Sequence, residues 1–568
     1  MNTGLDREQL LRLCRAFGME LHRPGQSQVH FLVQGDRNML ELGRRLKEAD
    51  YYLVTLAAND ERELEDHCFK LYYLFSHPCA DLFLVLENAL PPGAEVYPSL
   101  VDSFPAVDPF ERELADLFGV YPAENSTRVA RRTYLHPCYP AGLYPLRRDR
   151  SVQAIQNAVE SYSAGLAFAS RSLARRTLEE GEVLLPVGPI HAGVIEPGLF
   201  LFRTSGETIE GLEICLGYTH KGIERLFQSC YALQDGWRLA ERVSGDTSFA
   251  HSLAYCKAVE VLAQARLPDE AHLLRALLLE LERIANHTGD CGALAHDVAL
   301  EMVASELAVL REEILGLNQR LFGSRYLRGL NRPGGVQLPA PLNVTELRET
   351  VARVTDQFMN LAQWLGEMPG FRDRAIQIGV LPPAEARVAG VTGLVARASG
   401  LARDFRLQHP FGPYAEPQIR TLMEDRNSQG ASPIIYQAMT GDVFSRFLLR
   451  VQEVHVSAQL VEAFLERWEA GRGECRFVCA LDFSQAPNFE FGIGYAEGWR
   501  GDIVYWVMKD KFERIYRCKV RDPSTLNWPG LQAAVEPHQA DQHWQETSLV
   551  DFPLINKSFN LSYSGNDL

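Results

Sequence analysis

The sequence contains no Cys-x-x-Cys pair, no long apolar run and no excess of positive charge. Its 11 cysteines are dispersed and odd in number, which argues against a disulfide framework and favours a reducing compartment. No stretch reaches the roughly 18 uninterrupted apolar residues that a membrane-spanning helix needs. The formal net charge is −16, with 57 basic against 73 acidic side chains, so a nucleic-acid partner is not expected.

The N-terminus also lacks the apolar core of a secretory signal. Residues 1–17, MNTGLDREQLLRLCRAF, are charged and amphipathic and predict a helix instead. We therefore expect a cytoplasmic protein that reaches the inner face of the cell membrane only through partner subunits. The glycines of FGIGYAEG do not fit G-x-G-x-x-G and are flanked by strand patterns, so no dinucleotide site is expected in this chain.

The length and patterning predict an α+β chain of more than one domain. With 568 residues, 46% of them hydrophobic, the chain is long enough for two or more cores. Residues 1–125 predict a small α/β front domain, because short apolar runs rich in aromatic and β-branched residues precede a helical pattern. Residues 126–180 have little periodicity and predict an extended linker arm. Residues 181–568 predict a mainly helical domain with β additions.

Three segments of the large domain carry clear local signals. The stretch 268–289 repeats leucine at helical spacing after a proline and two acids, which predicts a long helix. A second helix is predicted after Thr345, a candidate N-cap. The run DIVYWVMKDKFERIYRCKV predicts a hairpin that turns at residues 509–511.

Several motifs follow one another in a single order along the chain. They are ERELADLFGV (111–120), LYPLRRD (143–149), GPIH (188–191), HKGIE (220–224), RVSGDTSFAH (242–251), ERIANH (282–287), RPGGV (332–336), GDVFSRFLLRVQE (441–453) and the tail SFNLSYSGNDL. Together they resemble the C-type and D-type subunits of respiratory complex I fused in one chain, as in the large subunit of formate hydrogenlyase-type (group 4) NiFe-hydrogenases. Collinear motifs over nearly the whole chain are far more specific than one short pattern.

The resemblance implies that the four cysteine ligands of a nickel–iron centre have been replaced. Their positions correspond to Ser244 and Thr247 in RVSGDTSFAH, and to Ser562 and Gly565 in the tail. A nickel–iron centre needs soft thiolate donors, whereas serine and threonine hydroxyls are hard ligands and glycine has no side chain. We therefore expect no metal and no cofactor in this chain, and no hydrogenase activity.

The quinone site of the complex I relatives is altered as well. The tyrosine that would bind the quinone corresponds to Gly245, and the second histidine of the GPxHxxxH loop corresponds to Ile195. His191 matches the first histidine, and Asp297 matches the aspartate that supports the quinone-site histidine. These two residues are candidate catalytic groups, and quinone binding stays open. For Asp297 the alternative is a pair with a local cation.

Glu224, in HKGIE, matches the glutamate that passes protons to a ligand cysteine in hydrogenases. An acid with a modestly raised pKa would still relay protons without the metal. The alternative is a solvated or salt-bridged helical acid, paired with Lys221 or Arg225.

Lys221, Arg242 and His251 are candidate groups facing a partner's iron–sulfur cluster or the vestigial cavity. Lys221 and Arg242 match basic residues that related subunits hold against the 4Fe–4S cluster of the neighbouring small subunit, where cations favour the reduced cluster. The alternative for both is a surface cation over apolar area. For His251, with no cysteine nearby, a buried hydrogen-bonded histidine is the favoured interpretation.

The resemblance implies a peripheral subunit of a membrane-bound, ion-translocating oxidoreductase that couples electron transfer to a membrane arm. The implied partners are a small Fe–S subunit of complex I B-type, a ferredoxin-like Fe–S subunit, a membrane-arm subunit of complex I H-type and antiporter-like subunits. Two alternatives stay open. One is a quinone reductase of complex I type with altered contacts, and the other is a non-redox scaffold of an ion transporter.

Overall fold

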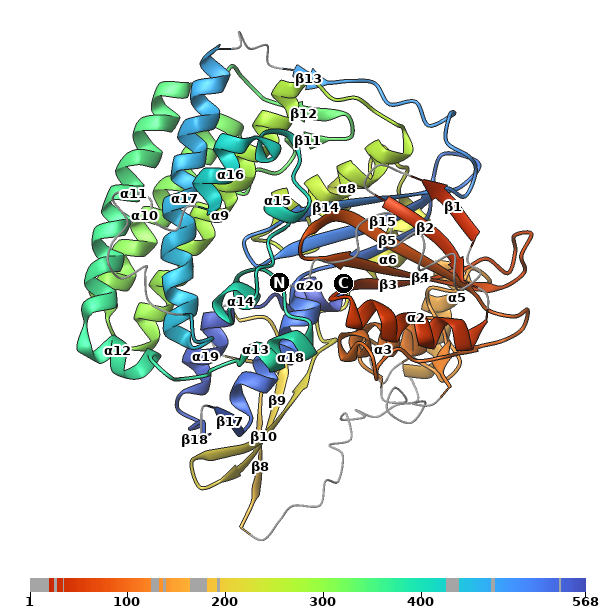
Figure 1. The fold of residues 1–568 in the computed structure, drawn as a ribbon, viewed down its shortest axis with the longest axis horizontal. Helices are drawn as coiled ribbons and strands as arrows, with labels where there is room; N and C mark the ends of the chain where they lie inside the picture. The colour runs from red at the N-terminus through yellow and green to blue at the C-terminus, as the bar shows by residue number, and fades with distance from the viewer. Residues whose placement is uncertain are drawn as a thin grey trace.

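The computed structural model describes residues 20–24, 28–33, 35–123, 132–135, 139–163, 181–191, 195–424, 439–470, 476–540 and 543–568. The helix predicted for residues 1–17 lies outside these ranges. Mixed helix and strand elements confirm the predicted α+β class, and a helical bundle and a sheet region stand side by side (Figure 1). Within the described ranges, no helix has both the length and the apolarity required to cross a membrane.

A five-stranded sheet forms the front domain, in the order β1-β2-β5-β4-β3. The pair β2 and β5 is parallel, and the other neighbours are antiparallel. The apolar runs VHFLV, YYLVTLA, KLYYLF and DLFLVL of the predicted front domain are all strands here. The elements are β1 (Glu20–Pro24), β2 (Gln28–Val33), α2 (Asp36–Glu48), β3 (Tyr52–Asp60), β4 (Phe69–His77), β5 (Ala80–Ala89), β6 (Val96–Tyr97), the 3-10 turn η1 (Pro105–Val107), α3 (Asp108–Leu117) and β7 (Tyr121–Pro122).

Both faces of this front sheet are buried. Side chains alternate across a strand, so Leu71 and Tyr73 of β4 pack toward α2 and α3 while Tyr72 and Leu74 face the opposite side. There they meet a second sheet, in the order β14-β15-β16, from the C-terminal half of the chain. Tyr72 and Trp506 are in contact, with ring centroids 4.8 Å apart. The front domain is therefore packed sheet against sheet onto the large domain.

The second sheet is the predicted hairpin with one further strand. It consists of β14 (Phe491–Glu497), β15 (Asp502–Lys509) and β16 (Ile515–Arg521), and the turn between β15 and β16 begins at Asp510. Its other face lies on helix α8 (Ser248–Leu262), which the large domain contributes. Two glycines of β14 make the approach close: a Cβ at Gly494 would lie 2.0 Å from the Ala254 carbonyl oxygen. The FGIGYAEG glycines thus serve helix–sheet packing.

Four long helices form the bundle at the left of Figure 1: α9 (Asp269–Asp297), α10 (Glu301–Phe322), α11 (Val344–Glu367) and α17 (Val443–Ala470). The helix α9 contains the predicted segment 268–289 and buries apolar side chains against α10 and α17. The N-cap of α11 is Asn343, whose side chain accepts a hydrogen bond from the Glu346 amide, so Thr345 was the wrong choice by two residues. An asparagine oxygen reaches an amide three residues on as well as a hydroxyl does.

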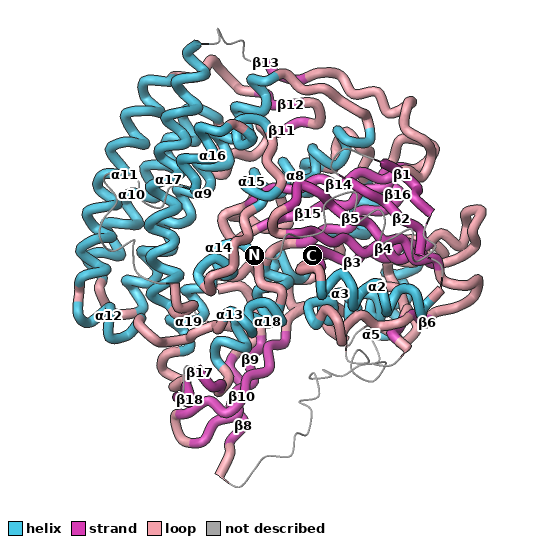
Figure 2. The backbone as a smooth tube through the Cα atoms, in the orientation of Figure 1, coloured by secondary structure: helices cyan, strands magenta, loops and turns pink. Residues whose placement is uncertain are grey.

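Shorter helices and strands, joined by loops and turns, connect these layers (Figure 2). Within the segment expected to be a linker arm, residues 152–163 form a helix. The shorter elements are α5 (Val152–Ser163), β8 (Val183–Val187), β9 (Leu199–Ser205), β10 (Thr208–Cys215), α6 (Ile223–Cys230), α7 (Trp237–Ala240), β11 (Asn331–Arg332), β12 (Gly335–Gln337), α12 (Pro369–Ala375), α13 (Pro383–Ala389), α14 (Gly393–Ala398), α15 (Phe405–Gln408), η2 (Gly412–Ala415), α16 (Pro417–Glu424), β13 (Arg476–Val478), α18 (Ser524–Val535), β17 (His538–Ala540), β18 (His543–Gln545), α19 (Phe552–Phe559) and α20 (Tyr563–Asp567).

We expect Gly494→Ala to destabilise the protein by about 1–3 kcal/mol or more, because the added methyl group meets the α8 backbone rather than a movable side chain. Thermal unfolding followed by circular dichroism measures this. Gly370→Ala on α12 is the matched control, since a Cβ there meets nothing within 4 Å. Equal unfolding midpoints for the two variants would contradict the packing argument.

Candidate functional site

The loop at residues 242–247 and the C-terminal tail meet in one buried polar site. The hydroxyls of Ser244 and Ser562, 318 residues apart in the chain, are joined by a hydrogen bond of 2.9 Å. Both side chains are buried. The Gly565 amide donates to the Ser562 hydroxyl at 2.9 Å. The two motifs that the sequence placed at opposite ends of the large domain therefore form a single site.

An ion pair fills the space beside these hydroxyls. The Arg500 guanidinium donates to both carboxylate oxygens of Asp246, at 2.7 and 2.8 Å, and stacks 3.9 Å from the centroid of the Trp499 ring. Thr247 and Ser244 donate their hydroxyls to the same carboxylate, at 2.9 and 3.1 Å. Although burial raises the pKa of Asp246, Arg500 and the hydroxyl donors lower it to about 2. Asp246 is therefore ionised at neutral pH.

A second carboxylate closes the site behind Gly565. A Cβ at Gly565 would lie 2.5 Å from the Asp522 carboxylate, so this position accepts a larger side chain only if Asp522 moves. Asp522 is hydrogen-bonded to His251 Nε2 at 3.0 Å, and His251 Nδ1 is hydrogen-bonded to the Tyr505 hydroxyl at 3.0 Å. His251 is fully buried, which confirms the interpretation as a hydrogen-bonded core histidine. Burial raises the pKa of Asp522, but His251 and Arg500 lower it below its usual value.

The structure brings Lys221 and Arg242 together. The Lys221 ammonium donates to the backbone carbonyls of Arg242 and Val243, at 3.1 and 3.0 Å, and fixes the start of the 242–247 loop. The Arg242 side chain is 58% exposed. Arg328, also exposed, donates to the Gly245 carbonyl at 3.3 Å. Exposed cations therefore surround the loop on the outside, while the Arg500–Asp246 pair lies beneath it.

Glu224 is a buried, ion-paired carboxylate rather than an acid with a raised pKa. It lies 2.6 Å from the Arg517 guanidinium and 3.4 Å from the Lys519 ammonium, and accepts the Val520 amide at 3.0 Å. Burial raises its pKa, but these cations dominate and lower it. Its partners are on β16 and are neither Lys221 nor Arg225. The expected direction of the pKa shift was wrong because the partners lie about 300 residues away in sequence.

His191 and Asp297 each have their own partner. His191 Nε2 is hydrogen-bonded to the Gly198 carbonyl at 2.8 Å, and the Asp297 carboxylate binds the Lys557 ammonium of α19 at 2.7 Å. Asp297 thus pairs with a local cation, as one of its two interpretations held. Ile195, at the position of the second histidine, is 47% exposed.

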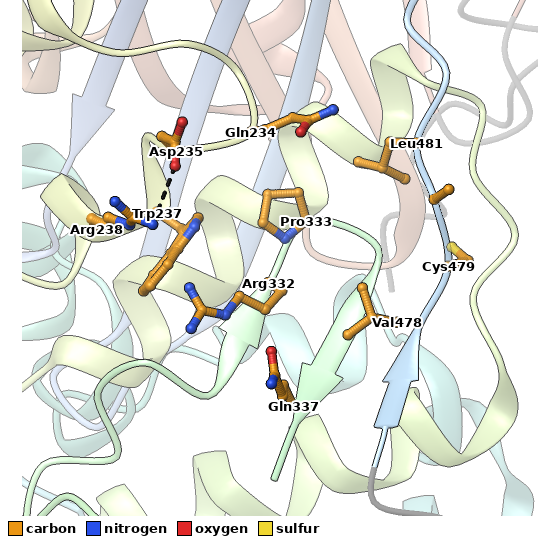
Figure 3. Close-up of a pocket in the computed structure, with 11 residues that line it drawn as sticks. Gln234, Asp235, Trp237, Arg238, Arg332, Pro333, Gln337, Val478, Cys479 and Leu481 are labelled. Carbon is orange, nitrogen blue, oxygen red and sulfur yellow. Dashed lines mark ion pairs between the residues drawn. The ribbon is translucent and has the colours of Figure 1, made fainter. Parts of the chain in front are cut away.

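A hollow of about 390 Å³ lies beside α7, between residues 234–238 and the strands β12 and β13 (Figure 3). The Arg332 guanidinium lies 3.9 Å from the centroid of Trp237, on α7. Arg238 extends on the same side of the hollow and pairs with Asp235 at 3.5 Å. Pro333, Val478 and Leu481 make up its apolar side. The hollow continues the exposed positive surface that begins at Arg242.

No metal centre emerges elsewhere in the described ranges, where no group of three His, Cys, Asp or Glu side chains is placed to hold an ion. His287 and Asp290, three residues apart on α9, have different partners. His287 is bonded to Glu453 at 2.9 Å and Asp290 to Arg450 at 2.8 Å. The two cysteines nearest to each other in the sequence are Cys475 and Cys479. Cys479 is a free thiol beside the Gly334 carbonyl, and Cys475 lies outside the described residues.

Sequence reasoning missed the residues that complete the polar site. Arg500 and Asp522 belong to EGWRGDIVYW and RDPSTLNWPGL, two segments in which the sequence alone singled out no functional residue. Glu282, in ERIANH, accepts the amides of Phe249 and Ala250 at 2.7 and 3.2 Å, and so caps the start of α8 from the neighbouring helix. The sequence signal for these residues is a charged side chain that stands among apolar residues, where burial is expected.

Comparison with known proteins identifies the family. Residues 297–479 match the respiratory-chain NADH dehydrogenase 49 kDa subunit, and residues 35–156 match the 30 kDa subunit. An NADH-quinone oxidoreductase subunit from Roseiflexus sp. is 30% identical over 369 residues, which cover 64% of this chain and 94% of the relative. The chain belongs to the 49 kDa subunit family. It carries the 30 kDa-type domain in front of it.

Similarity to the large hydrogenase chains extends over both domains. Formate hydrogenlyase subunit 5 from Escherichia coli is 29% identical over 517 residues, 91% of this chain and 84% of the relative. A chain from the membrane-bound sulfane sulfur reductase, an archaeal respiratory membrane complex, shares the fold with a TM-score of 0.58 at 22% identity, covering 69% of this chain and all of that one. The resemblance read from the motifs is thereby confirmed.

We expect Asp246→Asn to destabilise the protein by roughly 1–3 kcal/mol, because it leaves the buried Arg500 guanidinium without its counter-charge, while the 33% exposure of the Asp246 side chain lets water compensate in part. Asp246→Asn with Arg500→Met is the control, and we expect it to recover most of the loss. Since the pKa of Asp246 is lowered, the stability from this pair is present above the unfolded value of about 3.9 and is lost as the pH falls toward about 2. Urea unfolding at pH 7 and pH 3 measures both effects. A double variant as unstable as the single one would refute the pairing.

Proposed function

We propose that this chain is a peripheral subunit of a membrane-bound, ion-translocating oxidoreductase, on the cytoplasmic side, that works without a nickel–iron centre. It couples electron transfer from a neighbouring Fe–S subunit to the membrane arm. The names of its relatives support this, since they include subunits of formate hydrogenlyase, of NADH-quinone oxidoreductase and of a membrane-bound hydrogenase.

The observation that carries the proposal is the chemistry of the converged site. At the positions that resemble hydrogenase ligands, Ser244, Thr247 and Ser562 offer hydroxyls and Gly565 offers no side chain. Hydroxyls stay protonated near neutral pH and are poor ligands for soft metals. The guanidinium of Arg500 lies within 3.1 Å of the Thr247 hydroxyl, and a fixed cation at that distance opposes a second one. These residues do not fit a nickel–iron centre.

The outer surface supports docking of a partner that carries a 4Fe–4S cluster. Lys221 holds the loop that presents Arg242, and Arg238 and Arg328 extend the positive surface on either side. A reduced cluster on thiolate ligands is an anionic group that such a surface favours. The small Fe–S subunit of complex I B-type is the proposed partner. The ferredoxin-like, H-type and antiporter-like subunits follow by analogy with the relatives.

A non-redox scaffold is the second candidate, and the environment of Glu224 favours it. An acid held by Arg517 and Lys519 with a lowered pKa acts as a structural counter-charge. Quinone reduction has less support, because His191 and Asp297 are each bound to a separate neighbour.

The assembled complex, isolated through an affinity tag on this chain, should contain no stoichiometric nickel and show no infrared bands of iron-bound CO or CN. Ser244→Cys should not restore hydrogen turnover, because one thiolate cannot build a binuclear site. Metal analysis and infrared spectroscopy of the wild-type complex check this. Nickel near one atom per complex would refute the proposal.

Arg242→Ala should lower the midpoint potential of the partner's cluster by tens of millivolts, because a nearby cation stabilises the reduced, more negative state. Arg44→Ala on α2, a matched exposed arginine of the front domain, should leave the potential unchanged. Redox titration followed by electron paramagnetic resonance measures both. Equal potentials in the two variants would remove Arg242 from the cluster's surroundings. A complex without any cluster would favour the scaffold function.

A further inference from the structure

A cavity of about 180 Å³ lies at the junction of the front domain and the large domain. Its walls come from α3, from residues of the segments 134–135 and 139–155, from residues 220–222 and α6, and from Asp567 and Leu568. A single water needs roughly 10–15 Å³, so the cavity holds several. Three side-chain carboxylates line it: Glu113 from the front domain, and Glu224 and Asp567 from the large domain.

Glu113 has one cation and one free oxygen. One carboxylate oxygen binds the Lys519 ammonium, and the other, Oε1, has no hydrogen-bond partner among the residues that the structure describes. The side chain is 1% exposed. A buried carboxylate with an unsatisfied oxygen is costly unless it takes a proton.

Glu224 has more partners than Glu113. It faces Lys519 at 3.4 Å, and it also has Arg517 at 2.6 Å and the Val520 amide at 3.0 Å. Lys519 is therefore shared by two carboxylates, while Arg517 belongs to Glu224. Burial raises the pKa of Glu113 to about 7, with Lys519 opposing the rise and Glu224 adding to it, whereas the pKa of Glu224 is lowered.

We propose that Glu113 is the proton-exchanging residue of this cavity and that Glu224, across Lys519, is its permanently ionised counter-charge. The Glu113 carboxylate takes a proton from cavity water to become a neutral carboxyl group, and returns it to water. When Glu113 is neutral, Lys519 pairs with Glu224 alone, and when it is ionised, Lys519 is divided between the two. Proton uptake by Glu113 in the front domain thus changes the electrostatic field at the start of α6, where Glu224 lies.

Other charged groups surround the pair and set its field. Tyr134 lies on the front-domain side, and its pKa is raised well above the usual value by burial and by these carboxylates. The remaining titratable side chains that line the cavity are Tyr139, His220, Lys221, Arg225 and Asp567. Arg517, which lies on β16 as Lys519 does, pairs with Glu224 at 2.6 Å.

This inference rests on the proposed coupling function, but its first test does not need the complex. The full chain is titrated between pH 5 and pH 9, a window set at about two units either side of neutrality to span a shifted carboxyl group, with the infrared band of protonated carboxyl groups as the readout. Glu113→Gln should remove one component that titrates near pH 7. Glu111→Gln is the matched control. Glu111 lies on the same helix, is buried, and also has a pKa raised by burial to about 7, but it is hydrogen-bonded to Ser99 and does not line the cavity.

The two acids should differ in their response to the far side of the cavity. In Glu224→Gln, the midpoint of the Glu113 component should move to lower pH, because a neighbouring negative charge is removed, while the Glu111 component stays in place. Lys519→Met should move the Glu113 component to higher pH. Circular dichroism identifies variants that fail to fold. If Glu224→Gln or Lys519→Met does not fold, Glu113→Gln still tests the inference, because Lys519 stays paired with Glu224 in that variant.

In the assembled complex, Glu113→Gln should slow ion movement by about 10²–10⁴-fold, the range for positioned proton-transfer groups, and Glu111→Gln should not. An unchanged infrared titration in Glu113→Gln overturns the inference and leaves the proposed function untouched. Wild-type ion movement in the Glu113→Gln complex overturns it as well. Failure of the proposed function gives a different result: Glu113 titrates as expected, but the wild-type complex transfers no electrons.

Discussion

Two buried cations on one strand hold the front domain and the large domain together. Arg517 and Lys519 are two residues apart on β16, so their side chains leave the same face of the strand. Arg517 donates to the Ala58 carbonyl of the front sheet at 2.9 Å and faces Glu224 of α6, and Lys519 bridges Glu224 and Glu113. An unpaired buried cation costs several kcal/mol. Because Ala58 and Glu113 belong to the front domain and Glu224 to the large domain, the two cations have all their partners only when both domains are docked.

The same constraint governs the polar site, where the Arg500 guanidinium is paired with Asp246 and also donates to the Asn560 carbonyl and the Thr247 hydroxyl. The Ser244 hydroxyl donates to Asp246 and is also hydrogen-bonded to the Ser562 hydroxyl. The missing side chain at Gly565 leaves room for Asp522. The residues that would have to be thiolates are therefore part of a hydrogen-bonded network that stabilises the tail against the loop. Reverting one of them breaks that network before it creates a ligand.

Periodicity was enough to predict the strands of the front sheet, the long helix α9 and the hairpin of β15 and β16, because each depends on contacts within a few residues or on one continuous apolar face. It could not predict ion pairs whose members are about 250–300 residues apart, such as Arg500 with Asp246 or Arg517 with Glu224. The family resemblance singled out Glu224, but the expected direction of its pKa shift was wrong, since that direction depends on Arg517 and Lys519.

The position of Glu113 gives the domain fusion a physical reason. Two conditions raise the pKa of Glu113: burial at the domain junction, and the neighbouring negative charge of Glu224 in the large domain. Neither domain supplies both conditions. If the front domain moved away, Glu113 would return to water and ionise at its ordinary pKa, and Lys519 would keep only Glu224. Domain docking and protonation of Glu113 are therefore linked, and each favours the other.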